Sequence, residues 1–223
     1  MKNVMRPLVA ISIVAAMLAS GVLAQNGTIV PTDNLVVEGL PAIPASLADG
    51  VGRYTEFRGA SISSWHPTRR EMLISTRFGE TNQVHLLKMP GGARTQLTFS
   101  RERAGGASYR PKTGEFFIFN RDVGGNEFFQ YYRYDRADGT TTLLTDGKSR
   151  NTGWNWSNAG DRAVYMSTRR NGKDTDLYII NPSDPKSDRL LLQLEGGGWD
   201  VTDWSPDDSK LLLIEGVSIN ESY

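Results

Sequence analysis

Charged and amide side chains that could bind a ligand gather in the polar stretches between the apolar runs of this sequence. Two stretches, "RDVGGNEF" from Arg121 and "TRRNGK" from Thr168, place acids, amides and arginines close together. Paired opposite charges on loops can hold the ends of a peptide or dock a partner domain, and ordinary loop polarity is an equally good interpretation. We expect Asp122 and Glu127 to contact a substrate or a partner domain. The candidate contact residues are Arg121, Asp122, Asn126, Glu127, Arg169 and Arg170.

Residues typical of covalent or metal-dependent catalysis are scarce. The chain has no cysteine and two histidines. We expect His66 to lie in a turn and His85 to pack within a strand, so no metal site is expected. Strings at Gly59, Gly106 and Gly216 begin like the serine nucleophile motif G-x-S-x-G but lack its final glycine, and we interpret all three as structural. We therefore expect no catalytic residue, no metal ion and no cofactor in this chain.

The first two dozen residues have the layout of a secretory signal peptide. Lys2 and Arg6 precede an apolar run from Leu8 to Leu23, and "VLAQN" offers a small-residue cleavage site after Ala24. An uncleaved membrane anchor is the alternative. Cleavage would remove two of the 25 basic side chains and leave 23 against 25 acidic ones, or a charge of −2. We predict a periplasmic or secreted protein that binds no nucleic acid and has no stable membrane association after cleavage.

A repeat with a period of 44 to 48 residues positions the candidate residues. Four segments align without gaps: "SWHPTRREMLIST", "SYRPKTGEFFIFN", "NWSNAGDRAVYMS" and "DWSPDDSKLLLIE". A charged residue follows each aromatic anchor by six positions, and three apolar residues follow it. The anchors, which we interpret as structural, are Trp65, Tyr109, Trp156 and Trp204.

Each copy reads as four short strands, which predicts an all-β fold of β-propeller blades. The predicted blades span 57–98, 104–145, 151–195 and 199–223, and helical periodicity is absent from the chain after the leader. Residues 25–56 form a lead-in segment or supply a strand that closes the ring. Tyr223 falls at the start of a third strand, so we expect three full blades and half of a fourth. This predicts a fragment of a longer protein, or a short protein that completes its ring by dimerising.

The blade layout places the charged loops on one face. In an up-and-down blade, the loops between strands two and three share a face with the loops that lead to the next blade. This face should gather Arg77, Arg121, Asp122, Asn126, Glu127, Arg150, Arg169, Arg170, Asp174, Asp200 and Glu215.

Several long strings resemble exported bacterial peptidases of the prolyl oligopeptidase family. They include "FRGASISSWHPTRREMLISTRFGETNQVHLLKMPGGARTQLTF", "RDVGGNEFFQYYRYD", "STRRNGKDTDLYIINPSDPKSDRLL" and "GGGWDVTDWSPDDSKLLLIEGVSINESY", and together the strings cover nearly all of the chain after the leader. The resemblance implies an N-terminal propeller followed by an α/β-hydrolase domain that carries the Ser, Asp and His of a serine peptidase. The propeller would cap the active site and admit only short or flexible peptides. The hydrolase motif is not in this chain, which is therefore predicted to be inactive alone.

Three functions are compatible with these features. The first is the substrate-gating propeller of a secreted serine peptidase acting on short peptides, with the hydrolase domain of the same parent chain as its partner. The alternative is a non-catalytic periplasmic TolB-like propeller that serves as a binding or scaffold module. A propeller lactonase is the third, but it would need a carboxylate-ringed metal that the sequence does not supply.

Overall fold

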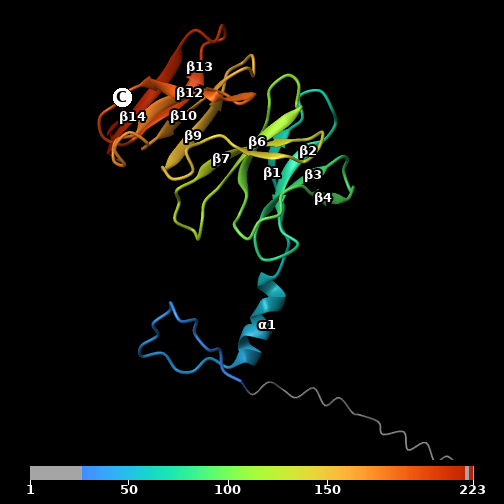
Figure 1. Ribbon diagram of the computed structural model, residues 1–223. Coiled ribbons are helices and arrows are strands. Elements are labelled where there is room, and N and C mark those ends of the chain that lie inside the picture. The colour runs from blue at the N-terminus through green and yellow to red at the C-terminus, as the bar shows by residue number, and fades with distance from the viewer. Residues whose placement is uncertain (1–26, 219–220, 223) are drawn as a thin grey trace, which may run out of the picture. The chain divides into compact units, whose positions relative to one another are not determined.

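The computed structural model describes residues 27–218 and 221–222 (Figure 1). The predicted signal peptide, residues 1–24, lies outside the described residues. The chain divides into two compact units, Met1–Phe57 and Arg58–Tyr223. Within the described ranges, no helix combines the length and the apolar character needed to cross a membrane.

The second unit consists of four antiparallel sheets, and the strands of each sheet follow one another in sequence order (Figure 1). The all-β partial propeller, with three four-stranded blades and an incomplete fourth, is thereby confirmed. Blade 1 contains β1 (Ser61–Trp65), β2 (Met72–Thr76), β3 (Gln83–Leu87) and β4 (Arg94–Gln96). Blade 2 contains β5 (Gly105–Tyr109), β6 (Phe116–Arg121), β7 (Gln130–Asp135) and β8 (Thr141–Leu143).

Blades 3 and 4 continue the same order. Blade 3 contains β9 (Asn151–Trp156), β10 (Ala163–Ser167), β11 (Asp176–Asn181) and β12 (Asp184–Leu192). Blade 4 contains β13 (Trp199–Trp204), β14 (Leu211–Ser218) and β15 (Glu221–Ser222). The short β15 pairs antiparallel with β14, so a third strand begins in blade 4.

Each aromatic anchor is the last residue of the first strand of its blade. Trp65 pairs with Met72 at the start of β2, and Trp204 pairs with Leu211 at the start of β14. The first strand of every blade also carries a register shift, which is typical of a β-bulge. A bulge bends the first strand. The anchor lies at the end of this strand, where the turn to the second strand begins.

The hydrophobic core lies between blades, not within them. One cluster joins Leu73 and Val84 of blade 1 to Phe117 of blade 2, and a second joins Phe116 of blade 2 to Tyr165 of blade 3. A third cluster joins blades 3 and 4. Strands β6 and β10 each contribute side chains to two clusters, one on either face, which explains why their sequences are continuous apolar runs.

Three of the four anchors contribute to these inter-blade clusters. Tyr109 (3 % exposed) and Trp204 (7 % exposed) are buried, and Trp156 packs against Phe116 with ring centroids 6.1 Å apart. Trp65 is 61 % exposed. Each of the other three rings contacts the blade that precedes its own, whereas no blade precedes β1 within the described residues.

Residues 27–57 of the first unit contain one helix, α1 (Ala45–Thr55), so the interpretation that helical periodicity is absent after the leader was wrong for this segment. The helix begins directly after Pro44 and has no buried residue. Leu47, Val51 and Tyr54 recur in it at helical spacing, and Gly50 and Gly52 lower its intrinsic helix propensity. A bridge between Thr28 and Pro44 ties the preceding segment to the start of the helix.

Candidate functional site

The loops after the second strand and the loops after the fourth strand of each blade lie at the same end of the blade. Hydrogen bonds join them in blade 1, where the Ala104 amide donates to the Asn82 carbonyl (2.9 Å), and in blade 3, where the Thr175 amide donates to the Gly196 carbonyl (2.9 Å). We call this end the loop face. It comprises residues 77–82, 97–104, 122–129, 144–150, 168–175 and 193–198.

A buried glutamine at the start of the third strand holds the loop face together in blades 1 and 2. In blade 2, Gln130 is 4 % exposed, and its Nε2 donates to the Ser149 carbonyl (2.7 Å) and the Phe128 carbonyl (3.0 Å). Its Oε1 accepts from Thr145 Oγ1 (2.8 Å). Gln83 and Thr98 repeat the pair in blade 1, with Oγ1 and Oε1 2.9 Å apart.

The role of these glutamines was not predicted, although the sequence contains a signal for it. The stretches 83–98 and 130–145 begin with Gln, end with Thr and align over sixteen residues. An amide that can both donate and accept is required where a buried position faces two carbonyls and a hydroxyl group.

In blade 3, an ion pair between Asp176 and Arg170 takes the place of the glutamine. Arg170 is one of the predicted site residues. Asp176 occupies the first position of β11 and is fully buried. Arg170 donates through Nε to Asp176 Oδ2 (2.8 Å), and through Nη2 to Asp174 Oδ2 (3.0 Å) and the Leu194 carbonyl (2.9 Å). Arg170 therefore braces its own loop.

Arg169 is also engaged within the blade. Its guanidinium pairs with Asp188 (2.6 Å), lies 4.3 Å from the ring centroid of Tyr178 and contacts the hydroxyl of Tyr165. Burial and the neighbouring Asp188 raise the pKa of Tyr165 above its usual range, so this hydroxyl keeps its proton. Neither Arg169 nor Arg170 is oriented to bind a ligand in this arrangement.

The β6–β7 loop holds the other predicted residues. Asp122 is 7 % exposed, and its Oδ2 accepts from the Glu127 amide (2.9 Å). Asn126 Oδ1 accepts from the Phe128 amide (2.9 Å). Glu127 has a positive φ of 62° and is exposed. Asp122 thus fixes the loop, and the loop presents the Glu127 carboxylate to solvent.

A cleft of about 540 Å³ opens on the loop face between blades 1 and 2. It brings together two of the predicted residues, Asp122 and Glu127, but not Asn126, Arg169 or Arg170. Arg121 lines a separate groove of about 470 Å³. The cleft is lined by Thr81, Glu102, Arg103, Gly105, Gly106, Asn120, Asp122, Gly125, Glu127 and Phe129.

Two charged residues and one amide of this cleft were missed from the sequence: Glu102, Arg103 and Asn120. The first two lie on the connection between blades, and Asn120 is near the end of β6. With Glu127 they provide two carboxylates, a guanidinium and an amide around one opening. Such a set can bind an ammonium group and hydrogen-bond to a peptide backbone.

The histidines lie outside the cleft lining. In the β1–β2 turn, His66 Nδ1 accepts from the amides of Thr68 (3.2 Å) and Arg69 (3.1 Å). His85 is fully buried in β3, and its Nδ1 donates to the Gln83 carbonyl (3.0 Å). In the part of the chain that the structure describes, no three His, Asp or Glu side chains gather as a metal site would require.

Comparison with known proteins establishes the fold. No protein-family model matches the sequence, and no curated protein matches it. A solved structure of a prolyl endopeptidase aligns with a TM-score of 0.56 and 13 % identity over 70 % of this chain and 26 % of that chain.

Two TolB structures also align. A putative TolB from Agrobacterium tumefaciens gives a TM-score of 0.49 and 20 % identity over 62 % of this chain and 51 % of that one. TolB from Acinetobacter baumannii gives 0.48 and 21 % identity over 71 % of this chain and 41 % of that one. The chain therefore spans about half or less of the length of the structures it matches. This chain has the β-propeller fold.

Proposed function

We propose that this chain is the propeller part of an exported serine peptidase of the prolyl oligopeptidase family. In this proposal the loop face controls the access of short peptides to a hydrolase domain of the same parent chain. The observation that carries it is the loop-face cleft, in which the exposed Glu127 and the partly exposed Glu102 have carboxylates suited to a peptide's amino end. The sequence resemblance and the shared fold with part of a prolyl endopeptidase support the choice of family.

The role of the propeller would be selection and orientation, not chemistry. Peptide bond cleavage would be carried out by the Ser, Asp and His of the hydrolase domain. The leader at residues 1–24 would direct the protein to the periplasm or the exterior, and the nearly balanced charge offers no attraction for nucleic acid. We expect the 223-residue chain to bind short peptides without hydrolysing them.

Calorimetric titration with a short peptide tests the binding step. A tripeptide with a free amino group should bind at least about tenfold more tightly than its N-acetylated form, because a charge-assisted hydrogen bond contributes ~1.5–3 kcal/mol. The double substitution Glu102→Gln and Glu127→Gln should abolish this preference. Asp122 is left intact because its replacement would disorder the loop that it braces.

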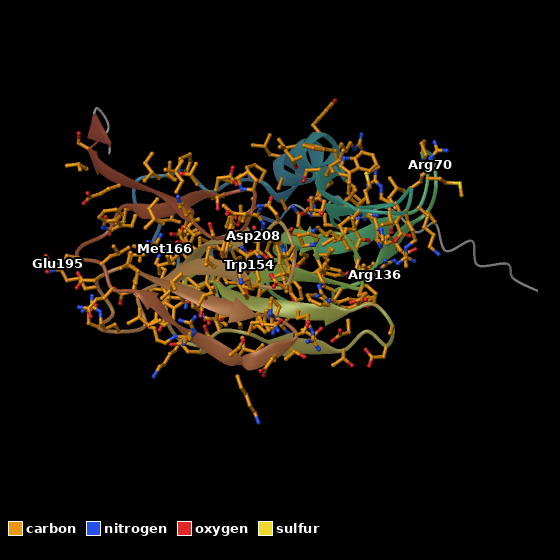
Figure 2. All side chains as sticks on the ribbon, turned by 90° about the horizontal axis from the view of Figure 1, so that it is seen from above. Arg70, Arg136, Trp154, Met166, Glu195 and Asp208 are labelled. Atoms are coloured by element: carbon orange, nitrogen blue, oxygen red, sulfur yellow. The ribbon has the colours of Figure 1, made fainter. Side chains whose placement is uncertain are left out.

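Glu195→Gln is the matched control. Glu195 lies on the loop face, is exposed and is absent from the cleft lining, so the same change of charge there should leave the preference intact (Figure 2). Equal binding of the free and acetylated peptides by the unsubstituted chain would contradict the proposal. Hydrolysis of a chromogenic peptide by this chain, abolished by a serine-directed inhibitor, would contradict the assignment of the chemistry to another domain.

A non-catalytic TolB-like binding or scaffold module is the second candidate. Arg169, Arg170 and Asp122 favour it, because they form ion pairs or hydrogen bonds within their own blades and are not free to bind a peptide. Determining the gene sequence beyond codon 223 separates the two. A downstream G-x-S-x-G motif with later Asp and His supports the peptidase, whereas a stop codon supports the scaffold.

A further inference from the structure

A second hollow in the blades is distinct from the loop-face cleft. Its volume is about 470 Å³, and it lies between the chain that follows β4 and the face formed by β6, β7 and β8. We call it the aromatic groove. It is lined by Leu97, Thr98, Phe99, Ser100, Phe119, Arg121, Tyr132, Tyr134, Gly139, Thr141 and Leu143.

The groove has an apolar, aromatic surface. Phe119 and Tyr132 are stacked with ring centroids 5.4 Å apart and form part of one wall. Phe99 is 79 % exposed and Leu143 is 41 % exposed, and both line the opening. Because exposed apolar surface is costly in water, such a groove favours a ligand with a large apolar side chain.

Arg121 supplies the one charge of the groove. Its guanidinium lies 4.5 Å from the ring centroid of Tyr132, which holds it against the aromatic wall. Of the described residues that line the groove, it is the only charged one. Nothing in the lining therefore neutralises the guanidinium.

Comparison with other arginines stacked on rings shows that this lack of a partner is particular to Arg121. Four of the six such arginines in the described residues form an ion pair with a carboxylate, and Arg162 donates to the Asp208 carbonyl. Within this part of the chain, Arg121 alone among the six has neither an ion pair nor a side-chain hydrogen bond. The four with carboxylate partners are Arg110, Arg133, Arg136 and Arg169.

We propose that the aromatic groove binds the carboxyl end of a peptide whose last residue is large and apolar. The carboxylate pairs with the Arg121 guanidinium, whose planar fork matches a carboxylate in two parallel hydrogen bonds. The last side chain packs on Tyr132 and Phe99, because Phe119 is only 3 % exposed and belongs to the core. Charge complementarity selects the carboxyl end, and the aromatic wall selects the side chain. This inference goes beyond the proposed gating function and does not require a hydrolase domain.

Titration of the full chain with acetyl-Ala-Ala-Phe tests the proposal. The peptide with a free carboxylate should bind at least about tenfold more tightly than its amide, because a charge-assisted bidentate pair is lost in the amide. Arg121→Gln should abolish this preference. Phe99→Ala should weaken both forms severalfold without changing their ratio, because only apolar contact is lost.

Arg70→Gln is the matched control for charge. Arg70 is exposed in the β1–β2 turn and is absent from the groove lining (Figure 2), so its substitution should leave the preference intact. If Arg121→Gln fails to fold by circular dichroism, Arg121→Lys replaces it. Arg121→Lys keeps the charge but loses the planar fork, so a reduced preference supports the proposal and an unchanged one overturns it.

Three further outcomes overturn the inference. The first is equal binding of the acid and the amide by the unsubstituted chain. The second is binding of 3-phenylpropionate as tight as that of the peptide, which would assign the groove to small aryl carboxylates. The third is loss of the preference in the Glu102→Gln and Glu127→Gln variant, which would place the peptide in the loop-face cleft. Retention of the preference there supports the groove even if the gating proposal fails.

Discussion

His66 and His85 are both held in positions that disfavour a positive charge. Burial lowers the pKa of His66 below its ordinary value of 6.5, and the neighbouring Arg69 and Arg136 lower it further. Burial also lowers the pKa of His85, although its hydrogen bond to the Gln83 carbonyl acts in the opposite direction. Both rings therefore bind a proton less readily in the folded chain than in the unfolded chain.

These two histidines predict that the protein is less stable in mild acid. The unfolded chain takes up protons near pH 6.5 and the folded chain does so only at lower pH, so the free energy of unfolding falls as the pH drops from 7.5 to 5. The slope is at most about 1.4 kcal/mol per pH unit for each histidine. Urea unfolding at pH 7.5, 6 and 5 measures it.

The double variant His66→Asn and His85→Gln is the control for this titration. It should show a flatter dependence over the same range, even if it is less stable overall. Aspartates such as Asp207, whose pKa is lowered to about 2 by hydrogen bonds from Ser205 and Ser209, titrate below this window. Equal slopes in the two proteins would contradict the assignment to histidine.

At the scale of the element, the hairpin turns between first and second strands interlock from blade to blade. The β9–β10 turn packs against blade 2, where Arg110 Nε donates to the Gly160 carbonyl (2.9 Å). Gly160 has a φ of +71°, and a Cβ there would lie 2.9 Å from the Pro111 carbonyl oxygen. This turn has room for glycine alone, for reasons of both backbone angle and space.

Gly160→Ala is therefore expected to lower the free energy of unfolding more than Gly172→Ala. Gly172 has a similar φ of +75°, and no atom lies within 4 Å of the position that an added methyl carbon would take, so its substitution isolates the cost of the backbone angle, ~1–2 kcal/mol. The clash with Pro111 should add ~1–3 kcal/mol at Gly160. Denaturant melts of the two variants measure the difference, and equal losses would refute the close approach.

The sequence predicted the strands of the second unit because the signals are local. An aromatic anchor, a turn and an apolar run lie within a dozen residues of one another.

The ion pair of Arg169 could not be predicted from a local pattern, because its partner Asp188 is brought near only by the pairing of β10, β11 and β12. The aromatic groove and the cleft join residues of two blades, and no local pattern reports which side chains meet there. Helix α1 was missed because its apolar stripe is short and two glycines, Gly50 and Gly52, disfavour a helix.

At the scale of the whole second unit, the anchors stabilise the contacts between blades. Trp204 packs among Val164 and Met166 of the preceding blade, and the Arg162 guanidinium lies 5.4 Å from its ring centroid. Trp65 holds the equivalent position in blade 1 but is mostly exposed. The same side chain at equivalent points of the repeat thus lies in two different environments.

We expect Trp204→Ala to cost ~3–5 kcal/mol of unfolding free energy, because it leaves a cavity between two blades. Trp65→Ala should cost less than ~1 kcal/mol, since an exposed side chain gives up little buried surface. Chemical denaturation of both variants provides the comparison. A loss below ~1 kcal/mol for Trp204→Ala, or equal losses for the two, would contradict the placement of Trp204 in the inter-blade core.

The shared cores also determine how this protein can come apart. Met166 and Trp154 lie among the packed side chains on opposite faces of the same blade, each facing a different neighbour (Figure 2). Melting of blade 3 would disrupt at once the cluster that it shares with blade 2 and the cluster that it shares with blade 4. Proteolytic excision of a single blade should thus yield no stable domain, and thermal disruption should spread from sheet to sheet as in other linear arrays of repeats.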